Sequence, residues 1–159
     1  MPLHAYSSHL RASDRRSEEE HPSSRVIRLL LVLILFALAL FLRTYRLHSL
    51  PPGLFFDEAS NGLDVLDILN GKLSVFFERN YGREPLFIYL QALSSYLLGP
   101  NPFALRLTSA VVGVVTTLAT FFAARRWFGY RAGLLSMALM TVSLWHVDLS
   151  RIGFRTITT

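Results

Sequence analysis

Residues 26–42 read VIRLLLVLILFALALFL, a run that is apolar throughout except for Arg28. Its 17 residues are near the short limit for a helix that crosses a hydrocarbon core of about 30 Å. Arg28 and Arg43 are expected to reach outward from its two ends and to lengthen the effective span. A secretory signal peptide would lie closer to Met1 and end in small residues. We therefore interpret the run as a retained membrane helix.

The composition of the whole chain supports a membrane protein. Hydrophobic residues make up 52% of the sequence and charged residues only 17%, which a soluble domain seldom matches. The absence of cysteine excludes a disulfide framework and thiolate metal ligands. The net charge of +5 comes largely from arginines that flank apolar runs, where they act as topology signals. We expect membrane lipids as partners and no nucleic acid.

Two later runs, 103–124 and 132–149, are also long enough to span a membrane. The short loop between them carries Arg125, Arg126 and Arg131, and arginine in short loops resists translocation. This places the loop in the cytoplasm together with the N-terminus. The polar segment 1–25 has no periodicity that could bury a face, which predicts a disordered cytoplasmic tail.

The segment 85–98 is apolar, but its 14 residues would reach only about 21 Å as a helix. If it crossed, the arginine loop would lie outside, against the charge rule. We expect it to lie in the outer interface, with polar residues such as Gln91 and Ser95 on one wet side. The predicted fold class is therefore an all-α integral membrane protein. It has about three transmembrane helices, and two interfacial helices lie in an external loop over 43–102.

An adjacent acid pair, Asp57 and Glu58, opens the first of these interfacial helices after the sequence PPGLFF at 51–56. One interpretation is structural, since Asp57 suits an N-cap and both acids complement the helix dipole. The other is catalytic, because a carboxylate at the edge of a bilayer can deprotonate a hydroxyl beside a lipid headgroup. The stiff Pro-Pro-Gly approach and the two phenylalanines favour a fixed depth, and hence the catalytic interpretation.

Further candidate site residues are Arg83, Glu84 and Arg106. Arg106 is near the outer end of a span, where an ionisable group is costly and a phosphate partner would explain it. The alternative is that it reaches any lipid phosphate. Arg83 and Glu84 precede the second interfacial helix and either shape the acceptor side or pair with each other.

Several motifs in this order resemble the family 39 glycosyltransferases. They are the Asp57-Glu58 pair after one span, REPLFIYLQAL at 83–93, LGPNPFALRL at 98–107 and RRWFGYRA at 125–132. These enzymes share the integral-membrane GT-C fold with protein O-mannosyltransferases and with the aminoarabinose and galacturonic acid transferases of bacterial lipopolysaccharide. Many relatives carry His-Pro-Pro where this chain has Arg83-Glu84-Pro85. The role of that histidine is therefore not assigned to any residue of this chain.

The resemblance implies an enzyme of the bacterial cell envelope, in the plasma membrane. It would move a sugar from a polyprenyl-phosphate donor to a lipid, glycan or protein acceptor at the outer face, with inversion. On this basis Asp57 is expected as the general base, Glu58 as its support and Arg106 as the ligand of the carrier phosphate. Arg83 and Glu84 are expected to position acceptor or donor. No cofactor and no metal ligands are indicated, although some relatives use a divalent cation near the acid pair.

Because family members run to several hundred residues, we expect the 159-residue chain to be a fragment that is inactive alone. The competing functions are a transporter subunit, which would place ionisable residues at mid-span, and a membrane scaffold. His146 and Asp148 form a candidate pair of metal ligands, but Trp145-His146 is more typical of an interfacial anchor. Arg151 and Arg155 are further candidates for a phosphate.

Overall fold

A computed structural model describes residues 22–79, 82 and 84–153 of the chain. Every regular element in this part is a helix, which confirms the predicted all-α class. The helices are α2 (Pro22–Thr44), α3 (Phe56–Leu69), α4 (Pro85–Leu98), α5 (Pro102–Phe128), α6 (Tyr130–Val142) and α7 (Leu144–Arg151). The chain divides into two compact units, 1–34 and 35–159, and the second holds every contact described below.

In the described part of the chain, two helices are long and apolar enough to cross a membrane, Ser24–Thr44 within α2 and Pro102–Phe128. The first has 21 residues and would measure about 31 Å, close to the thickness of a hydrocarbon core. Its first half exposes a nearly unbroken apolar surface, which hydrocarbon would cover. The helix starts at Pro22, so the last residues assigned to the predicted tail are helical, while residues 1–21 lie outside the described part.

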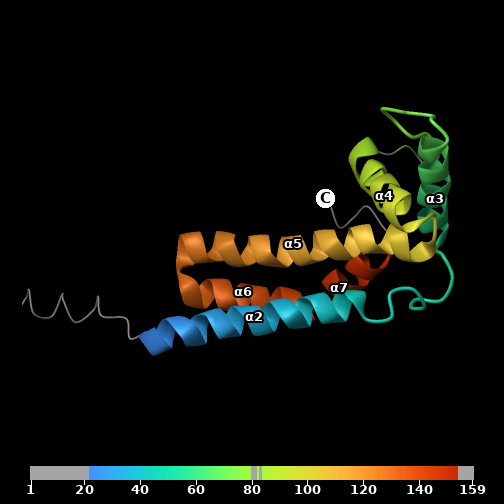
Figure 1. The fold of residues 1–159 in the computed structure, drawn as a ribbon. Helices are drawn as coiled ribbons and strands as arrows, with labels where there is room; N and C mark the ends of the chain where they lie inside the picture. Colours follow the sequence, from blue (N-terminus) through green and yellow to red (C-terminus); the bar gives the residue numbers. More distant parts are fainter. Residues whose placement is uncertain (1–21, 80–81, 83, 154–159) are drawn as a thin grey trace, which may run out of the picture. The chain divides into compact units, whose positions relative to one another are not determined.

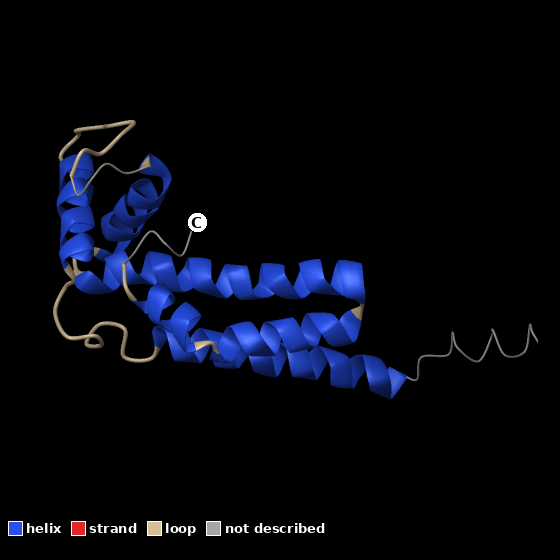
Figure 2. Ribbon diagram, turned by 180° about the vertical axis from the view of Figure 1, so that it is seen from behind, coloured by secondary structure: helices blue, strands red, loops and turns tan. Residues whose placement is uncertain are grey.

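The third predicted span, 132–149, is divided between α6 and α7, which meet at Ser143 with a bend of 59°. The pair passes the length and composition test only when taken together, which gives up to three spans. In Figures 1 and 2, α6 returns alongside α5 in the opposite direction. The return is made at Gly129, whose φ of 89° favours glycine and whose N–H donates to the Arg125 carbonyl.

The start of α5 follows from its sequence. Asn101 is the N-cap, and its Oδ1 accepts a hydrogen bond of 2.9 Å from the Ala104 N–H. Pro102 occupies the first helical position, where a missing N–H costs nothing. These two residues fix where the helix begins and so fix the position of Arg106, one turn further on.

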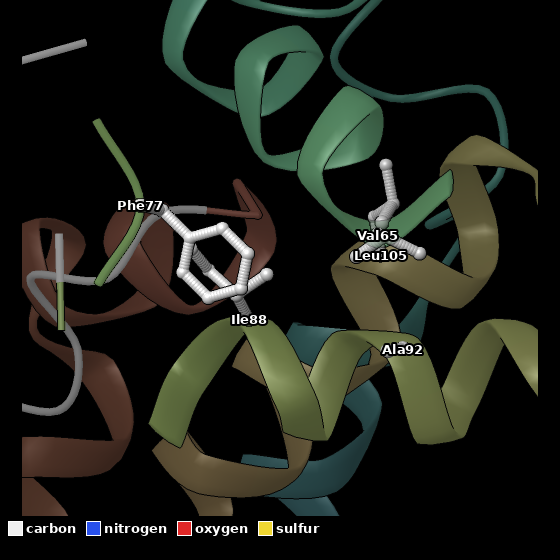
Figure 3. Close-up of a cluster of buried hydrophobic side chains, with 5 residues drawn as sticks. All are labelled: Val65, Phe77, Ile88, Ala92 and Leu105. Atoms are coloured by element: carbon white, nitrogen blue, oxygen red, sulfur yellow. The ribbon is translucent and has the colours of Figure 1, made fainter. Parts of the chain in front are cut away.

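The loop before α5 carries two helices, α3 and α4, which run antiparallel to each other (Figure 1). They pack through a small apolar cluster that Figure 3 shows, and Leu105 ties this cluster to α5. The members are Val65, Phe77, Ile88, Ala92 and Leu105. The two predicted short helices of the loop are therefore present, and they form one packed unit with α5.

The distribution of polar and apolar side chains on α3 is the reverse of that on a surface helix of a soluble protein. Glu58, Asn61 and Asp64 are buried, whereas Leu63 and Leu66 are exposed. In α4, likewise, Gln91 and Ser95 are buried, so the prediction that they form a wet side is wrong. The reason is that Gln91 donates to carbonyl groups inside the protein. The polar residues of this pair hold the interior together, and its leucines face outward.

Candidate active site

Glu58 and Arg106 form a buried ion pair between α3 and α5. Arg106 Nε donates to Glu58 Oε1 at 2.7 Å, and Nη2 donates to Oε2 at 3.1 Å. The exposed fractions of the two side chains are 0% and 1%. A two-point contact between a guanidinium and a carboxylate is among the stronger polar contacts in proteins. Breaking such a pair leaves a buried charge without compensation.

The other N–H groups of Arg106 are directed at the loop between α2 and α3. Nη1 donates to the carbonyls of Leu47 at 3.4 Å and Pro51 at 2.9 Å, and Nη2 also donates to that of Gly53. A guanidinium has five N–H donors, and all of them are used by these contacts together with Glu58. In this conformation Arg106 is therefore a positioning group. Its predicted role in binding the carrier phosphate would require one of these carbonyls to be replaced.

The carboxylate of Glu58 is equally occupied. Oε1 accepts a second hydrogen bond from the Gly153 N–H at 3.2 Å, and Oε2 accepts one from the Phe55 N–H at 3.3 Å. Four donors therefore surround a group that has about four lone-pair sites. Glu58 could take a proton from a substrate only by giving up contacts that hold it, so it is unsuited to act as a base.

Asp57 lies next to this pair in the first turn of α3 and is half-buried. The N-cap is Phe55, so the interpretation of Asp57 as the cap residue is wrong. The helix starts two residues earlier than an aspartate cap at position 57 would require, because Glu58 in the third position receives the Phe55 N–H. Asp57 is left in the first turn, where the helix dipole favours a negative charge.

Three residues of the site were missed by sequence reasoning as parts of it: Asn61, Gln91 and Gly153. The Gly153 carbonyl accepts hydrogen bonds from Asn61 Nδ2 at 2.8 Å and from Gln91 Nε2 at 3.3 Å. The spacing of Asn61 three residues after Glu58 was a usable signal, because it puts both side chains on one face. Gly153 carried no local signal, since it meets Glu58 across 95 positions of the chain.

Glu84 lies apart from the acid pair. It is the exposed N-cap residue of α4, and because α3 and α4 are antiparallel, it lies near the end of α3 that is opposite to Asp57 (Figure 1). Arg83 lies outside the described residues. The structure therefore brings together Asp57, Glu58 and Arg106, but not Glu84.

A second polar group occupies the end of α3 and the loop that follows. Arg79 bridges Asp64 at 2.8 Å and Asp67 at 2.7 Å, and Lys72 contacts Asp67 at 3.1 Å. Hydrogen bonds from Lys72 and Arg79 hold the pKa of the Asp67 carboxyl below its usual value. The same carboxylates raise the pKa of Arg79. These contacts fold the loop back onto α3, far along the helix from Asp57.

Two arginines join α7 to the end of α2. Arg43 is completely buried instead of reaching the interface, and it donates to the carbonyls of Ala39 and Met140 and to His146 Nδ1 at 2.7 Å. Arg151 donates to the carbonyls of Leu42 at 2.7 Å and Tyr45 at 2.8 Å. Both cations thus satisfy carbonyls near helix ends.

These contacts bear on the other candidates of the C-terminal region. His146 pairs with Arg43, and Arg151 is engaged with backbone carbonyls and is not directed at a phosphate site. Among the described residues, no three side chains of the metal-ligating types lie close enough to hold an ion. Arg155 lies outside the described part.

Comparison with known proteins gives one family. Residues 83–158 match the family model described as dolichyl-phosphate-mannose-protein mannosyltransferase. The match supports the resemblance to family 39 glycosyltransferases and a membrane protein with glycosyltransferase ancestry. It includes Arg106 and Gly153, whereas Asp57 and Glu58 precede it. No curated protein and no solved structure matches the chain significantly.

Proposed function

We propose, from the match of residues 83–158 to the family model described as dolichyl-phosphate-mannose-protein mannosyltransferase, that Asp57 is the base of a lipid-linked sugar transfer. The donor is a polyprenyl-phosphate sugar and the acceptor carries a hydroxyl group. The reaction takes place at the extracytoplasmic face of the cell membrane, and the N-terminus is cytoplasmic. The arginines of the α5–α6 turn support this orientation through the charge rule.

The observation that carries the proposal is the difference in exposure between the two neighbouring acids. All lone-pair sites of Glu58 are occupied by Arg106, Gly153 and Phe55, and its side chain is completely buried. Asp57 is half-buried in the adjacent position and is the acid that a substrate could reach. We therefore assign a structural role to Glu58 and the reactive role to Asp57.

The transfer is a single displacement. The acceptor hydroxyl gives its proton to the Asp57 carboxylate as its oxygen forms a bond to the anomeric carbon. The bond from that carbon to the carrier phosphate breaks, and its electron pair remains on the phosphate oxygen. The configuration at the anomeric carbon is inverted, and Asp57 then releases the proton to water.

Arg106 supports this step by holding the acid-bearing turn. Its contacts to Glu58 and to the carbonyls of Leu47, Pro51 and Gly53 fix the α2–α3 loop relative to α5. Direct contact of Arg106 with the carrier phosphate stays a prediction, as do the roles of Arg83 and Glu84 in positioning and a divalent cation at Asp57. A cation there would find no free lone pair on Glu58.

A transfer assay tests the proposal. The enzyme that contains this segment is reconstituted in lipid and given labelled mannose on a polyprenyl phosphate, with a nucleotide-linked mannose as the control donor. We expect label to move from the polyprenyl donor only, while the 159-residue chain by itself turns over little. Transfer from the nucleotide donor, or none from either, contradicts the proposal.

A further inference from the structure

The backbone of Gly153 enters the α3–α4 pair beside the acid site. Its N–H donates to Glu58 Oε1 at 3.2 Å, and its carbonyl accepts from Asn61 Nδ2 at 2.8 Å and from Gln91 Nε2 at 3.3 Å. A single residue after the last span therefore contacts both helices of the external loop. It lies next to the carboxylate that neighbours the proposed base.

A side chain at this position would be tightly packed. A Cβ on Gly153 would lie 3.1 Å from Gln91 Nε2, 3.1 Å from Glu58 Cγ and 3.2 Å from Glu58 Oε1. Neither neighbour can move away freely, because Gln91 Nε2 also donates to the Leu105 carbonyl and Glu58 is held by Arg106. The requirement for glycine is thus one of space.

The position of Gly153 is set from the other side by α7, which ends two residues earlier at Arg151. Arg151 is bonded to the carbonyls of Leu42 and Tyr45 at the end of α2. Gly153 is therefore held between the α2–α7 junction and the acid site. Gly153 thus connects the chain that follows α7 to Glu58.

We propose that Gly153 is a positioning residue of the acid site, which holds Glu58 and through it the helical turn that carries Asp57. Gly153 does not touch substrate. A displacement of the Glu58 backbone moves Asp57 with it, because the two share a peptide bond in the first turn of α3. Only the expected change in transfer rate rests on the proposed function. The placement of Glu58 by Gly153 can be tested independently of that function.

The first test is carboxyl labelling of the 159-residue chain in lipid with a water-soluble carbodiimide and an amine, read by mass spectrometry. The variants are Gly153→Ala and the matched control Gly62→Ala. Gly62 is also on α3, but an added Cβ would meet Leu105 Cδ1 at 3.3 Å, the end of a flexible side chain. We expect Glu58 to stay unlabelled in the parent and in Gly62→Ala, and its labelling to rise several-fold in Gly153→Ala.

Equal protection of Glu58 in all three proteins overturns the inference, and so does equal labelling in both variants. If Gly153→Ala fails to fold, Asn61→Ala decides the question, because it removes one contact to the Gly153 carbonyl without adding volume. Increased labelling of Glu58 in that variant supports the role of Gly153, and unchanged protection contradicts it.

The second test uses the transfer reaction of the enzyme that contains this segment. A misplacement of about 1 Å at a reacting group can lower a rate about 100-fold. We expect Gly153→Ala to lower kcat about 10- to 100-fold with little change in KM for the donor, since Gly153 touches no substrate. A raised KM at unchanged kcat contradicts a positioning role. If Glu58 becomes labelled but no protein, parent included, transfers sugar, the proposed function fails and the structural inference stands.

Discussion

The guanidinium of Arg106 lies along the carboxylate of Glu58, with Nε 2.7 Å from Oε1 and Nη2 3.1 Å from Oε2. The pair joins α5 to the loop that carries α3 across 48 positions of the chain. Because both groups are fully satisfied and excluded from solvent, the pair acts as a structural anchor. The neighbouring Asp57 is half-buried and is the residue that we propose as the reactive acid.

Replacing Glu58 by Gln should destabilise the fold, because it leaves the Arg106 cation buried without a counter-charge. The expected loss in the free energy of unfolding is about 3–5 kcal/mol, measured by detergent-induced unfolding in mixed micelles. Glu78→Gln, at an exposed position, serves as the control and should change little. The double variant Glu58→Leu with Arg106→Met should lose less than Glu58→Gln alone. A Glu58→Gln protein as stable as its parent contradicts the anchor role.

Gly113 of α5 packs directly against α7. A Cβ on Gly113 would lie 2.5 Å from Ser150 Cβ, which ordinary packing does not allow. Gly113→Ala should therefore cost about 1–3 kcal/mol of unfolding free energy through overpacking. Adding Ser150→Gly removes the opposing atom and should recover part of the loss in a double-mutant cycle. Purely additive effects of the two substitutions would show that the α5–α7 contact is not close.

The contacts of Asp67 predict that its contribution to the stability of the fold depends on pH in the acid range. Lys72 and Arg79 lower the pKa of Asp67 relative to the ordinary value of 3.8. A carboxyl group whose pKa is lowered by folding contributes stability above its unfolded pKa, and this contribution disappears as the pH falls through the lower folded value. Carbon-13 NMR of labelled aspartate carboxyls should show Asp67 titrating below 3.8.

In Arg79→Met the midpoint of Asp67 should move up toward the ordinary value, because one of its two cationic partners is gone. The signal of Asp67 is assigned by its loss in Asp67→Asn. An unchanged midpoint in Arg79→Met would mean that the Arg79 bridge is not formed in solution.

The proposed orientation can be tested with single cysteines, since the sequence has none. Asn70 follows α3 in the external loop, and Trp127 is an exposed residue at the end of α5. A membrane-impermeant maleimide should label Asn70→Cys in intact cells and label Trp127→Cys only after permeabilisation. The opposite pattern would place the acid pair in the cytoplasm and remove the proposed donor from reach.

The sequence was sufficient to predict where the helices lie along the chain. It was not sufficient to predict which of their faces pack against each other. Apolar runs located α2 and α5, and the bounds of the apolar segment 85–98 agree with those of α4. The three-residue spacing of Glu58, Asn61 and Asp64 places them on one face of a helix. It could not tell that this face points inward, because that depends on partners such as Arg106 and Gly153, which are remote in the chain.

The candidate site could also be predicted only in part. Asp57, Glu58 and Arg106 were identified from residue types and from the cost of charge near a membrane. Their distinct roles follow only from the contacts, which occupy Glu58 and Arg106 with each other. The bend at Ser143 was not predicted, because 132–149 has no proline to mark it.

The most direct test of the central claim is the single-turnover rate of sugar transfer by Asp57→Asn in the enzyme that contains this segment. Asparagine keeps the size of the side chain but cannot accept the proton. The account predicts a fall in rate of about 100- to 10,000-fold, with binding of the polyprenyl-phosphate sugar unchanged. Transfer at the parental rate in Asp57→Asn would contradict the assignment of Asp57 as the base.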